Sequence, residues 1–345
     1  MSRPERVVEN LNRALHAHLA ADPRLYLLGE DVEDPYGGAF KVTKGLSTVY
    51  GERVIGTPLS EGGIVGVAGG LALAGDKALV EIMFGDFAAL AFDQLLNFAS
   101  KSVSMYGRPV PMHLVVRCPS GGGRGYGPTH SQSLQKHFVG IPGLALYEMS
   151  PFHDNHDVLG RMLGAGSPGV FFEDKVLYTH RMAAAGVVDE LFRFDFLDQA
   201  GEFARIYADD PGELDCLLIG AGGMTDRALT AMRELLLVDE IAVQLVVPSR
   251  LYPFDVEPVL PLAAKAGVVC VVEESTAGGT WGAEVAAVLH TRLWETLRRP
   301  VRLVHSADSI IPTATHLERE VLVGAATIRA AVKSELASRR ERSLT

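Results

Sequence analysis

The sequence Pro58-Leu-Ser-Glu-Gly-Gly-Ile-Val-Gly-Val-Ala-Gly-Gly-Leu-Ala-Leu-Ala-Gly75 joins one carboxylate to a long run of apolar and small residues. Its small residues recur at helical spacing, at Gly62, Gly66, Gly70 and Ala74. On a helix, this spacing forms a stripe without large side chains, along which a second helix can pack closely. Glycine costs about 0.8–1 kcal/mol relative to alanine inside a helix. The stripe therefore predicts a tightly packed helix.

The single charged residue of this stretch is Glu61, at the start of the predicted helix. A carboxylate that enters apolar surroundings is unfavourable unless it is paired or is used by a functional site. A glutamate in the first turn also complements the helix dipole, and for the stretch alone this structural interpretation is the simpler one. The rest of the chain must decide between the two.

Length and composition describe a globular protein of about two domains. The chain has 345 residues, 48% hydrophobic content and a net charge of −10, which argues against general binding to nucleic acid. Its three cysteines, Cys118, Cys216 and Cys270, form no CxxC pair, and this pattern predicts a reducing cytoplasm. The N-terminus has no apolar signal region, and the run over 62–75 is too short for a membrane span. We therefore expect a cytoplasmic protein without a membrane or nucleic-acid partner.

Strand-like apolar runs alternate with helical patterns along most of the chain. This alternation predicts an α/β fold of two domains, each a mainly parallel sheet flanked by helices. The pattern becomes charged and irregular near residue 180 and regular again near 213. We expect a first domain over residues 1–182, a linker over 183–212 with a short hairpin, and a second domain over 213–340.

Three residues follow predicted strands of the first domain. They are Glu61, then Phe87 after the strand Ala78–Phe84, and His130 in the glycine-rich loop after the strand Pro111–Arg117. Ligands of open parallel sheets bind at the carboxyl ends of the strands. One crevice is therefore expected to collect all three side chains.

The order of short motifs resembles the β subunit of the thiamine-diphosphate-dependent first component of 2-oxoacid dehydrogenase complexes, of the pyruvate, branched-chain and acetoin types. The resemblance runs nearly end to end. The motifs that carry it are Leu28-Gly-Glu-Asp31, Tyr36-Gly-Gly-Ala-Phe-Lys-Val42, Thr57-Pro-Leu-Ser-Glu61, Gly63-Ile-Val-Gly66, Asp86-Phe87, Phe92-Asp-Gln94, His130-Ser-Gln-Ser133, Pro142-Gly-Leu144, Phe172-Glu173, Leu177-Tyr178, Tyr252-Pro-Phe-Asp255, Val271-Val-Glu-Glu274 and Gly282-Ala-Glu284. It implies a thiamine-diphosphate-binding pyrimidine domain followed by a transketolase C-terminal-like domain.

The resemblance also implies roles for site residues. Glu61 would hydrogen-bond N1′ of the cofactor's aminopyrimidine ring, and Phe87 would stack on that ring. His130 would be the catalytic histidine that contacts the substrate carboxylate or a developing alkoxide. Leu59 and Gln132 would be further cofactor-binding residues. The preceding loop, with Arg124 and Tyr126, departs from the arrangement common in the family, so its role is left open.

The diphosphate half of such a site is missing from this chain. The superfamily holds Mg²⁺ and diphosphate with Gly-Asp-Gly followed later by Asn, whereas this chain has Gly75-Asp-Lys77 and Gly85-Asp-Phe87 without such an Asn. No metal ligand is therefore assigned here. We expect thiamine diphosphate with Mg²⁺ held mainly by an α subunit, in an α₂β₂ heterotetramer.

The expected function is decarboxylation of a 2-oxoacid with acyl transfer to a lipoyl group, with a lipoyl acyltransferase as a further expected partner. An alternative is a carboligase or acyltransferase subunit that works in biosynthesis without lipoyl domains. A third, less favoured interpretation is an assembly subunit without catalysis. The identity of the 2-oxoacid stays open.

Overall fold

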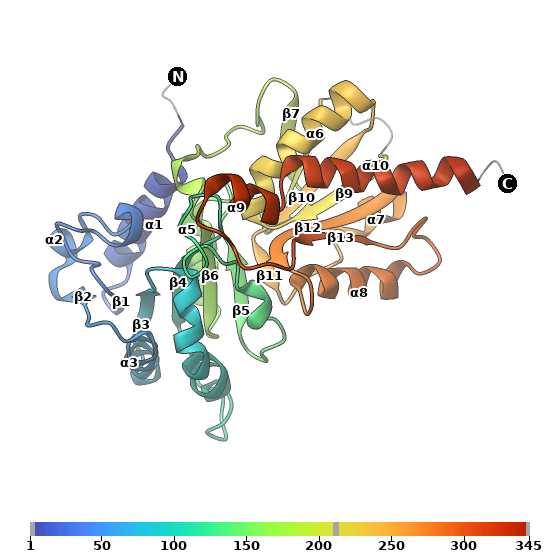
Figure 1. Cartoon of the computed structure of the whole chain (residues 1–345). Coiled ribbons are helices and arrows are strands. Elements are labelled where there is room, and N and C mark those ends of the chain that lie inside the picture. Colours follow the sequence, from blue (N-terminus) through green and yellow to red (C-terminus); the bar gives the residue numbers. More distant parts are fainter. Residues whose placement is uncertain (1–3, 210–213, 343–345) are drawn as a thin grey trace.

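The computed structural model describes residues 4–209 and 214–342 and contains two sheets flanked by helices (Figure 1). The first sheet has the strand order β11-β5-β6-β4-β3-β1-β2, and all its neighbours are parallel except β11 and β5. Its strands are β1 (Leu25–Gly29), β2 (Val54–Gly56), β3 (Lys77–Glu81), β4 (Leu114–Ser120), β5 (Ala145–Glu148), β6 (Gly169–Asp174) and β11 (Arg250–Tyr252). The expected parallel α/β architecture is thus confirmed for the first half.

The second sheet has the order β13-β12-β9-β10-β8-β7, parallel from β13 to β10 and antiparallel from β10 to β7. Its strands are β7 (Phe192–Phe196), β8 (Phe203–Ala208), β9 (Cys216–Gly220), β10 (Val243–Pro248), β12 (Val268–Thr276) and β13 (Arg302–Ser306). The hairpin expected within 183–212 is formed by β7 and β8. Because β8 pairs with β10, this interval supplies the edge of the second sheet and is not a free linker. The expected boundary at 212–213 lies outside the described residues.

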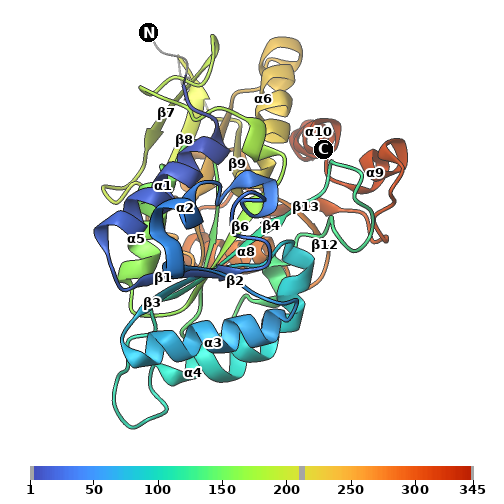
Figure 2. The same cartoon turned by 90° about the vertical axis from the view of Figure 1, so that its left-hand side faces the viewer.

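Helices cover both faces of each sheet. Their bounds are α1 (Val7–Ala21), α2 (Leu46–Tyr50), α3 (Glu61–Ala74), α4 (Ser100–Ser102), α5 (Asn155–Gly164), α6 (Thr225–Asp239), α7 (Leu260–Lys265), α8 (Trp281–Leu293), α9 (Thr315–Val321) and α10 (Ala325–Arg342). Figure 2 shows α1 and α5 on one face of the first sheet and α3 and α4 on the other. In the described part of the chain, no helix is long and apolar enough to cross a membrane.

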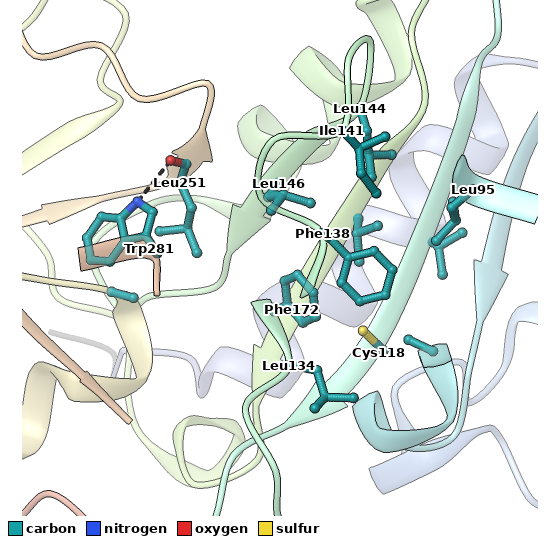
Figure 3. Close-up of a cluster of buried hydrophobic side chains, with 14 of the residues drawn as sticks. Leu95, Cys118, Leu134, Phe138, Ile141, Leu144, Leu146, Phe172, Leu251 and Trp281 are labelled. Atoms are coloured by element: carbon teal, nitrogen blue, oxygen red, sulfur yellow. Dashed lines mark hydrogen bonds between the residues drawn. The ribbon is translucent and has the colours of Figure 1, made fainter. Parts of the chain in front are cut away.

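A continuous apolar core joins the two sheets (Figure 3). It runs from Phe138 and Phe172 of the first half to Leu251 and Trp281 of the second. The Trp281 indole is buried and donates its Nε1 hydrogen to the Leu251 carbonyl oxygen at 2.9 Å. Leu251 lies in β11, so the second half of the sequence supplies the last strand of the first sheet. The same residue also belongs to the apolar core between the two sheets.

The glycines Gly62, Gly66 and Gly69 of α3 pack against another segment of the same chain. The run rich in Ala, Leu and Phe after Phe87 predicts one regular helix over about 88–102, but the structure has a 3₁₀ segment (Gly85–Ala91), a π-helical turn (Gln94–Ala99) and α4 there. A Cβ atom built on Gly62 would lie 3.1 Å from the Leu90 carbonyl oxygen, and one on Gly69 would lie 2.4 Å from Cε1 of Phe98. The family resemblance implies that Gly62, Gly63 and Gly66 let two helices, one from each subunit, approach each other, and this stays a prediction. The close approach found here is to the chain's own 85–99 segment, whereas Gly70 has no neighbour within 4 Å.

Candidate active site

The site lies where β2, β3 and β4 end. Strand β2 leads to Glu61, β3 leads to Phe87 and β4 leads to the loop with His130. The strands β4, β3, β1 and β2 are neighbours in this order, and their carboxyl ends share one edge of the sheet. Glu61 begins α3, and the next residue, Gly62, faces Leu90 of the segment that carries Phe87. Glu61, Phe87 and the His130 loop therefore follow strands that end at the same edge of the sheet, and a crevice shared by all three stays a prediction.

Glu61 is an almost buried carboxylate without a protein partner. Its residue is 9% exposed, and within the described residues no hydrogen bond or ion pair is recorded for its side chain. The neighbouring Glu30 is also buried, and its Oε1 atom has no hydrogen-bond partner there. Burial, followed by the charge of Glu61, raises the pKa of Glu30. Two carboxyl groups at one helix entrance, with unused oxygens, suit a ligand that offers hydrogen-bond donors.

Phe87 and His130 lie in one aromatic cluster. Their ring centroids are 5.2 Å apart at an interplanar angle of 82°, and Phe84 lies between them and Tyr126. The distance from Phe84 to His130 is 4.7 Å, with an edge-to-face arrangement. His130 Nδ1 is 2.9 Å from the Thr129 hydroxyl, so this atom is occupied while Nε2 is left for a ligand. The structure thus brings together two residues that lie far apart in the sequence.

Gln132 holds the loop to the aromatic segment. Its backbone N–H and its side-chain Nε2 both donate to Oδ1 of Asp86, at 3.2 and 2.8 Å. Gln132 therefore links the loop that carries His130 to Asp86, the residue before Phe87. Leu59, by contrast, is 81% exposed and makes its side chain available to a ligand or a second protein.

Sequence reasoning missed Lys175, whose side chain is fully buried beneath this cluster. Its ammonium nitrogen lies 5.6 Å from the centroid of the Phe84 ring and has no hydrogen-bond partner among the described residues. Burial lowers its pKa, against the opposing charges of Asp174 and Asp86. A lysine after a predicted buried strand was the signal available in the sequence. Oδ2 of Asp86 also has no hydrogen-bond partner among the described residues. The Lys175 ammonium group and the Asp86 carboxylate therefore place two charged groups beneath the site.

A buried ion network forms the floor of the site. Arg117 donates to Glu173 from Nε at 2.6 Å and from Nη2 at 2.8 Å, and to Glu81 from Nη1 at 2.9 Å. The Tyr178 hydroxyl donates to Glu173, and the Ala39 N–H donates to Glu81 at 2.6 Å. All three charged side chains are at most 1% exposed. The network therefore ties β3, β4 and β6 to the loop before α2, which contains the Tyr36–Val42 motif.

A cleft of about 640 Å³ opens beside the loop. Gln132 and Ser133 line one wall, and Ser275, Asp308 and Ile310 of the second half line the other. Within residues 4–209 and 214–342, no group of three or more His, Cys, Asp or Glu is arranged to hold a metal ion. The site offers an acid, aromatic rings and a histidine, which fit a heteroaromatic ring and a carboxylate-bearing substrate.

Comparison with known domain families gives two matches. The family described as "Transketolase, pyrimidine binding domain" matches residues 6–180, and "Transketolase, C-terminal domain" matches residues 208–328. A solved structure named "Split gene transketolase, inactive beta4 tetramer" superimposes with a TM-score of 0.71 at 19% identity, over 97% of this chain and 99% of that one. This likeness shows the fold.

Curated relatives are similar over nearly the whole chain. The Leifsonia xyli pyruvate dehydrogenase E1 component subunit beta is 34% identical, covering 89% of this chain and 88% of that protein. The Bacillus subtilis 2-oxoisovalerate dehydrogenase subunit beta is 31% identical, with 94% and 97% covered. The Cupriavidus necator acetoin:2,6-dichlorophenolindophenol oxidoreductase subunit beta is 30% identical, with 97% and 98% covered.

Fold and site thus define a transketolase-like protein with a pyrimidine-binding domain and a C-terminal domain. More particularly, the chain belongs to the family of β subunits of the thiamine-diphosphate-dependent first components of 2-oxoacid dehydrogenases. The expected family and enzyme class are confirmed, and the carboligase alternative is not favoured by these relatives.

Proposed function

We propose that Glu61, Phe87 and His130 form the pyrimidine half of a thiamine diphosphate site in a 2-oxoacid decarboxylating enzyme. The observation that carries the proposal is the almost buried Glu61 without a protein partner, at the same strand edge as the Phe87–His130 pair. When bound, thiamine diphosphate supplies a C2 carbanion that adds to a 2-oxo group and accepts the electrons released with CO₂.

With the cofactor bound, the Glu61 carboxyl group would hold a proton at N1′ of the pyrimidine ring, which is the protonation that the cofactor's own base would require. The carboxyl group of Glu30, whose pKa is raised by burial and by the charge of Glu61, accepts a hydrogen bond from the Ser60 backbone N–H and lies beside Glu61. A low-dielectric setting strengthens a hydrogen bond from a carboxylic acid to a ring nitrogen.

Phe87 provides a half-buried aromatic surface for the pyrimidine ring, for which stacking adds about 0.5–1.5 kcal/mol beyond the burial of area. His130, with Nδ1 near Thr129, presents Nε2 to the substrate. There it would donate a hydrogen bond to the carboxylate or to the 2-oxo oxygen of the substrate. Gln132 keeps both residues in register through Asp86.

We further propose that an α subunit completes the site and holds Mg²⁺ and the diphosphate, in an α₂β₂ heterotetramer. The relatives named above are all beta subunits, and exposed apolar side chains on this chain flank the site: Leu59, Val67 and Leu90. Exposed apolar groups that cluster in one region mark an interaction surface. The same proposal includes a lipoyl acyltransferase, which carries the lipoyl group that accepts the acyl group.

The proposed location is the cytoplasm. The three cysteines are free thiols and buried, which suits a reducing compartment. Fractionation of cells that produce the tagged protein tests this point, and recovery with the membrane or secreted fraction would contradict it.

The decisive experiment is reconstitution of this chain with the α subunit of the same enzyme. The expected result is thiamine-diphosphate-dependent release of CO₂ from one of the tested 2-oxoacids, starting with pyruvate and 2-oxoisovalerate, with reduction of lipoamide. Glu61→Ala is expected to lower the rate by about 10²-fold or more, because a positioned proton donor contributes this much. Glu52→Ala, at an exposed glutamate nearby, is the matched control.

Full activity of the Glu61→Ala complex would refute the catalytic assignment and revive the assembly interpretation. Decarboxylation with carboligation but without lipoamide reduction would favour the biosynthetic alternative.

A further inference from the structure

The two ends of the glycine-rich loop that carries His130 are hydrogen-bonded to each other. The Gly121 N–H donates to the Gln132 carbonyl oxygen at 3.2 Å, so the chain returns on itself after eleven residues. At the same point, Oε1 of Glu274 accepts from the Gly122 N–H at 2.7 Å and from the Ser133 hydroxyl at 2.9 Å. A carboxylate of the second half of the chain therefore joins both ends of the loop.

A second carboxylate, Glu318 of α9, binds the part of the loop over residues 123–125. Its Oε1 accepts from the Gly123 N–H at 2.9 Å, and its Oε2 accepts from the Gly125 N–H at 3.1 Å. Glu318 is only 1% exposed, and no ion pair is recorded for it among the described residues. A buried carboxylate needs compensating donors, and here they are backbone groups of the loop.

The loop backbone is shaped for these carboxylates. Positive φ angles alternate along it, and the residues that adopt them are Gly121 (+82°), Gly123 (+84°), Gly125 (+71°) and Gly127 (+77°). This alternation turns successive N–H groups toward one side, which is how backbone concavities bind anions. The packing is also close, since a Cβ atom on Gly122 would lie 2.4 Å from Cδ1 of Leu322, just after α9.

We propose that Glu318 is a positioning residue for the reaction: α9 of the C-terminal domain fixes the glycine loop and thereby the place of His130 and Tyr126. The path is direct. Glu318 holds residues 123–125, Tyr126 touches the edge of Phe84, and His130 lies against Phe84 and Phe87. The link joins residues 195 positions apart in the sequence. Its catalytic consequence rests on the proposed function, whereas its structural consequence does not.

The experiment compares Glu318→Ala and Glu318→Gln with Glu320→Gln, at an exposed glutamate of the same helix, in the reconstituted complex. The first measurement is amide hydrogen exchange. Exchange over residues 121–133 should become at least about tenfold faster in Glu318→Ala, since two backbone N–H groups lose their buried acceptor. Exchange in β9 (Cys216–Gly220) should be unchanged, which controls for general unfolding. Glu318→Gln keeps the shape and one acceptor oxygen, so an intermediate effect is expected.

The second measurement is kinetics with the accepted 2-oxoacid. Displacement of His130 should lower kcat by about tenfold or more with a smaller change in KM, and should alter the pH profile of kcat/KM. Glu320→Gln should match the wild type in both measurements.

Unchanged exchange over 121–133 in Glu318→Ala would refute the inference that Glu318 holds the glycine loop. Faster exchange with unaltered kcat and pH profile would overturn the positioning role. An equal effect of Glu320→Gln would also overturn it, because helix charge alone would then be the cause. If the wild-type complex decarboxylates no 2-oxoacid while loop exchange responds as described, the proposed function is refuted, but the inference that Glu318 fixes the glycine loop is supported.

Discussion

Replacing Arg117 with Met should destabilise the protein strongly, because it strands two buried carboxylates. Three charge-assisted hydrogen bonds of 2.6–2.9 Å are lost, and Glu81 and Glu173 stay in a region that is at most 1% exposed. Removing one partner of a buried ion pair costs about 3–5 kcal/mol. We therefore expect the free energy of unfolding to fall by about 4 kcal/mol, a factor of roughly 10³ in the unfolding equilibrium constant.

The expected loss depends on pH. Burial already raises the pKa of Glu81, and without the guanidinium this pKa should rise further. Near pH 5 the unpaired Glu81 carboxyl group takes up a proton more readily than near pH 8, so the loss of stability caused by Arg117→Met should be smaller at pH 5. Replacing Glu81 and Glu173 with Gln in the same variant should recover part of the loss and remove this dependence.

The assay is urea unfolding followed by the fluorescence of Trp281, which is buried in the core between the sheets. Arg292→Met is the control, since Arg292 pairs with Glu257 at the surface, where such pairs contribute about 0–1 kcal/mol. A loss for Arg117→Met no larger than the loss for this control would refute the reasoning about the buried network.

Three further outcomes are expected. Burial raises the pKa of Glu148 to about 8. The protonated side chain therefore contributes fully to the free energy of unfolding below about pH 4.5, and this contribution, on the order of 5 kcal/mol, is lost as the pH rises through about 8. Glu148→Gln should flatten the pH dependence of the unfolding free energy between pH 5 and 8, and an unchanged slope would contradict this. Gly69→Ala should cost about 1–3 kcal/mol because its Cβ atom meets Phe98, whereas Gly70→Ala, in open space, should stabilise α3 by up to about 1 kcal/mol; equal midpoints in urea would contradict the packing. Trp281→Ala should cost about 3–5 kcal/mol, and a loss under 1 kcal/mol would show that the core does not depend on it.

Local patterns predicted the elements of the first sheet with few errors. The apolar runs Ala78–Phe84 and Pro111–Arg117 predicted β3 (Lys77–Glu81) and β4 (Leu114–Ser120), and the small-residue stretch predicted α3 from Glu61 to Ala74. These predictions succeeded because strand and helix periodicities are written in neighbouring residues. The prediction of one regular helix over about 88–102 was wrong in detail, since this segment contains a 3₁₀ segment and a π-helical turn.

Part of the candidate site was also visible in the sequence. Glu61, Phe87 and His130 were found from their places after strands and from the resemblance to a family, and the structure brings Phe87 and His130 into contact. The acceptor of Gln132 was not visible, because the sequence does not say that Asp86 binds its amide.

The sequence by itself determined the alternation of strands and helices, the two-domain α/β architecture and the carboxylate that begins α3. Tertiary structure alone decided that β11 completes the first sheet, that Lys175 lies beneath the aromatic cluster and that Glu318 holds the glycine loop. The physical reason is sequence distance. A pattern of neighbouring residues fixes local conformation, whereas the partner of a buried charge or an open strand edge is chosen only when distant segments are packed together.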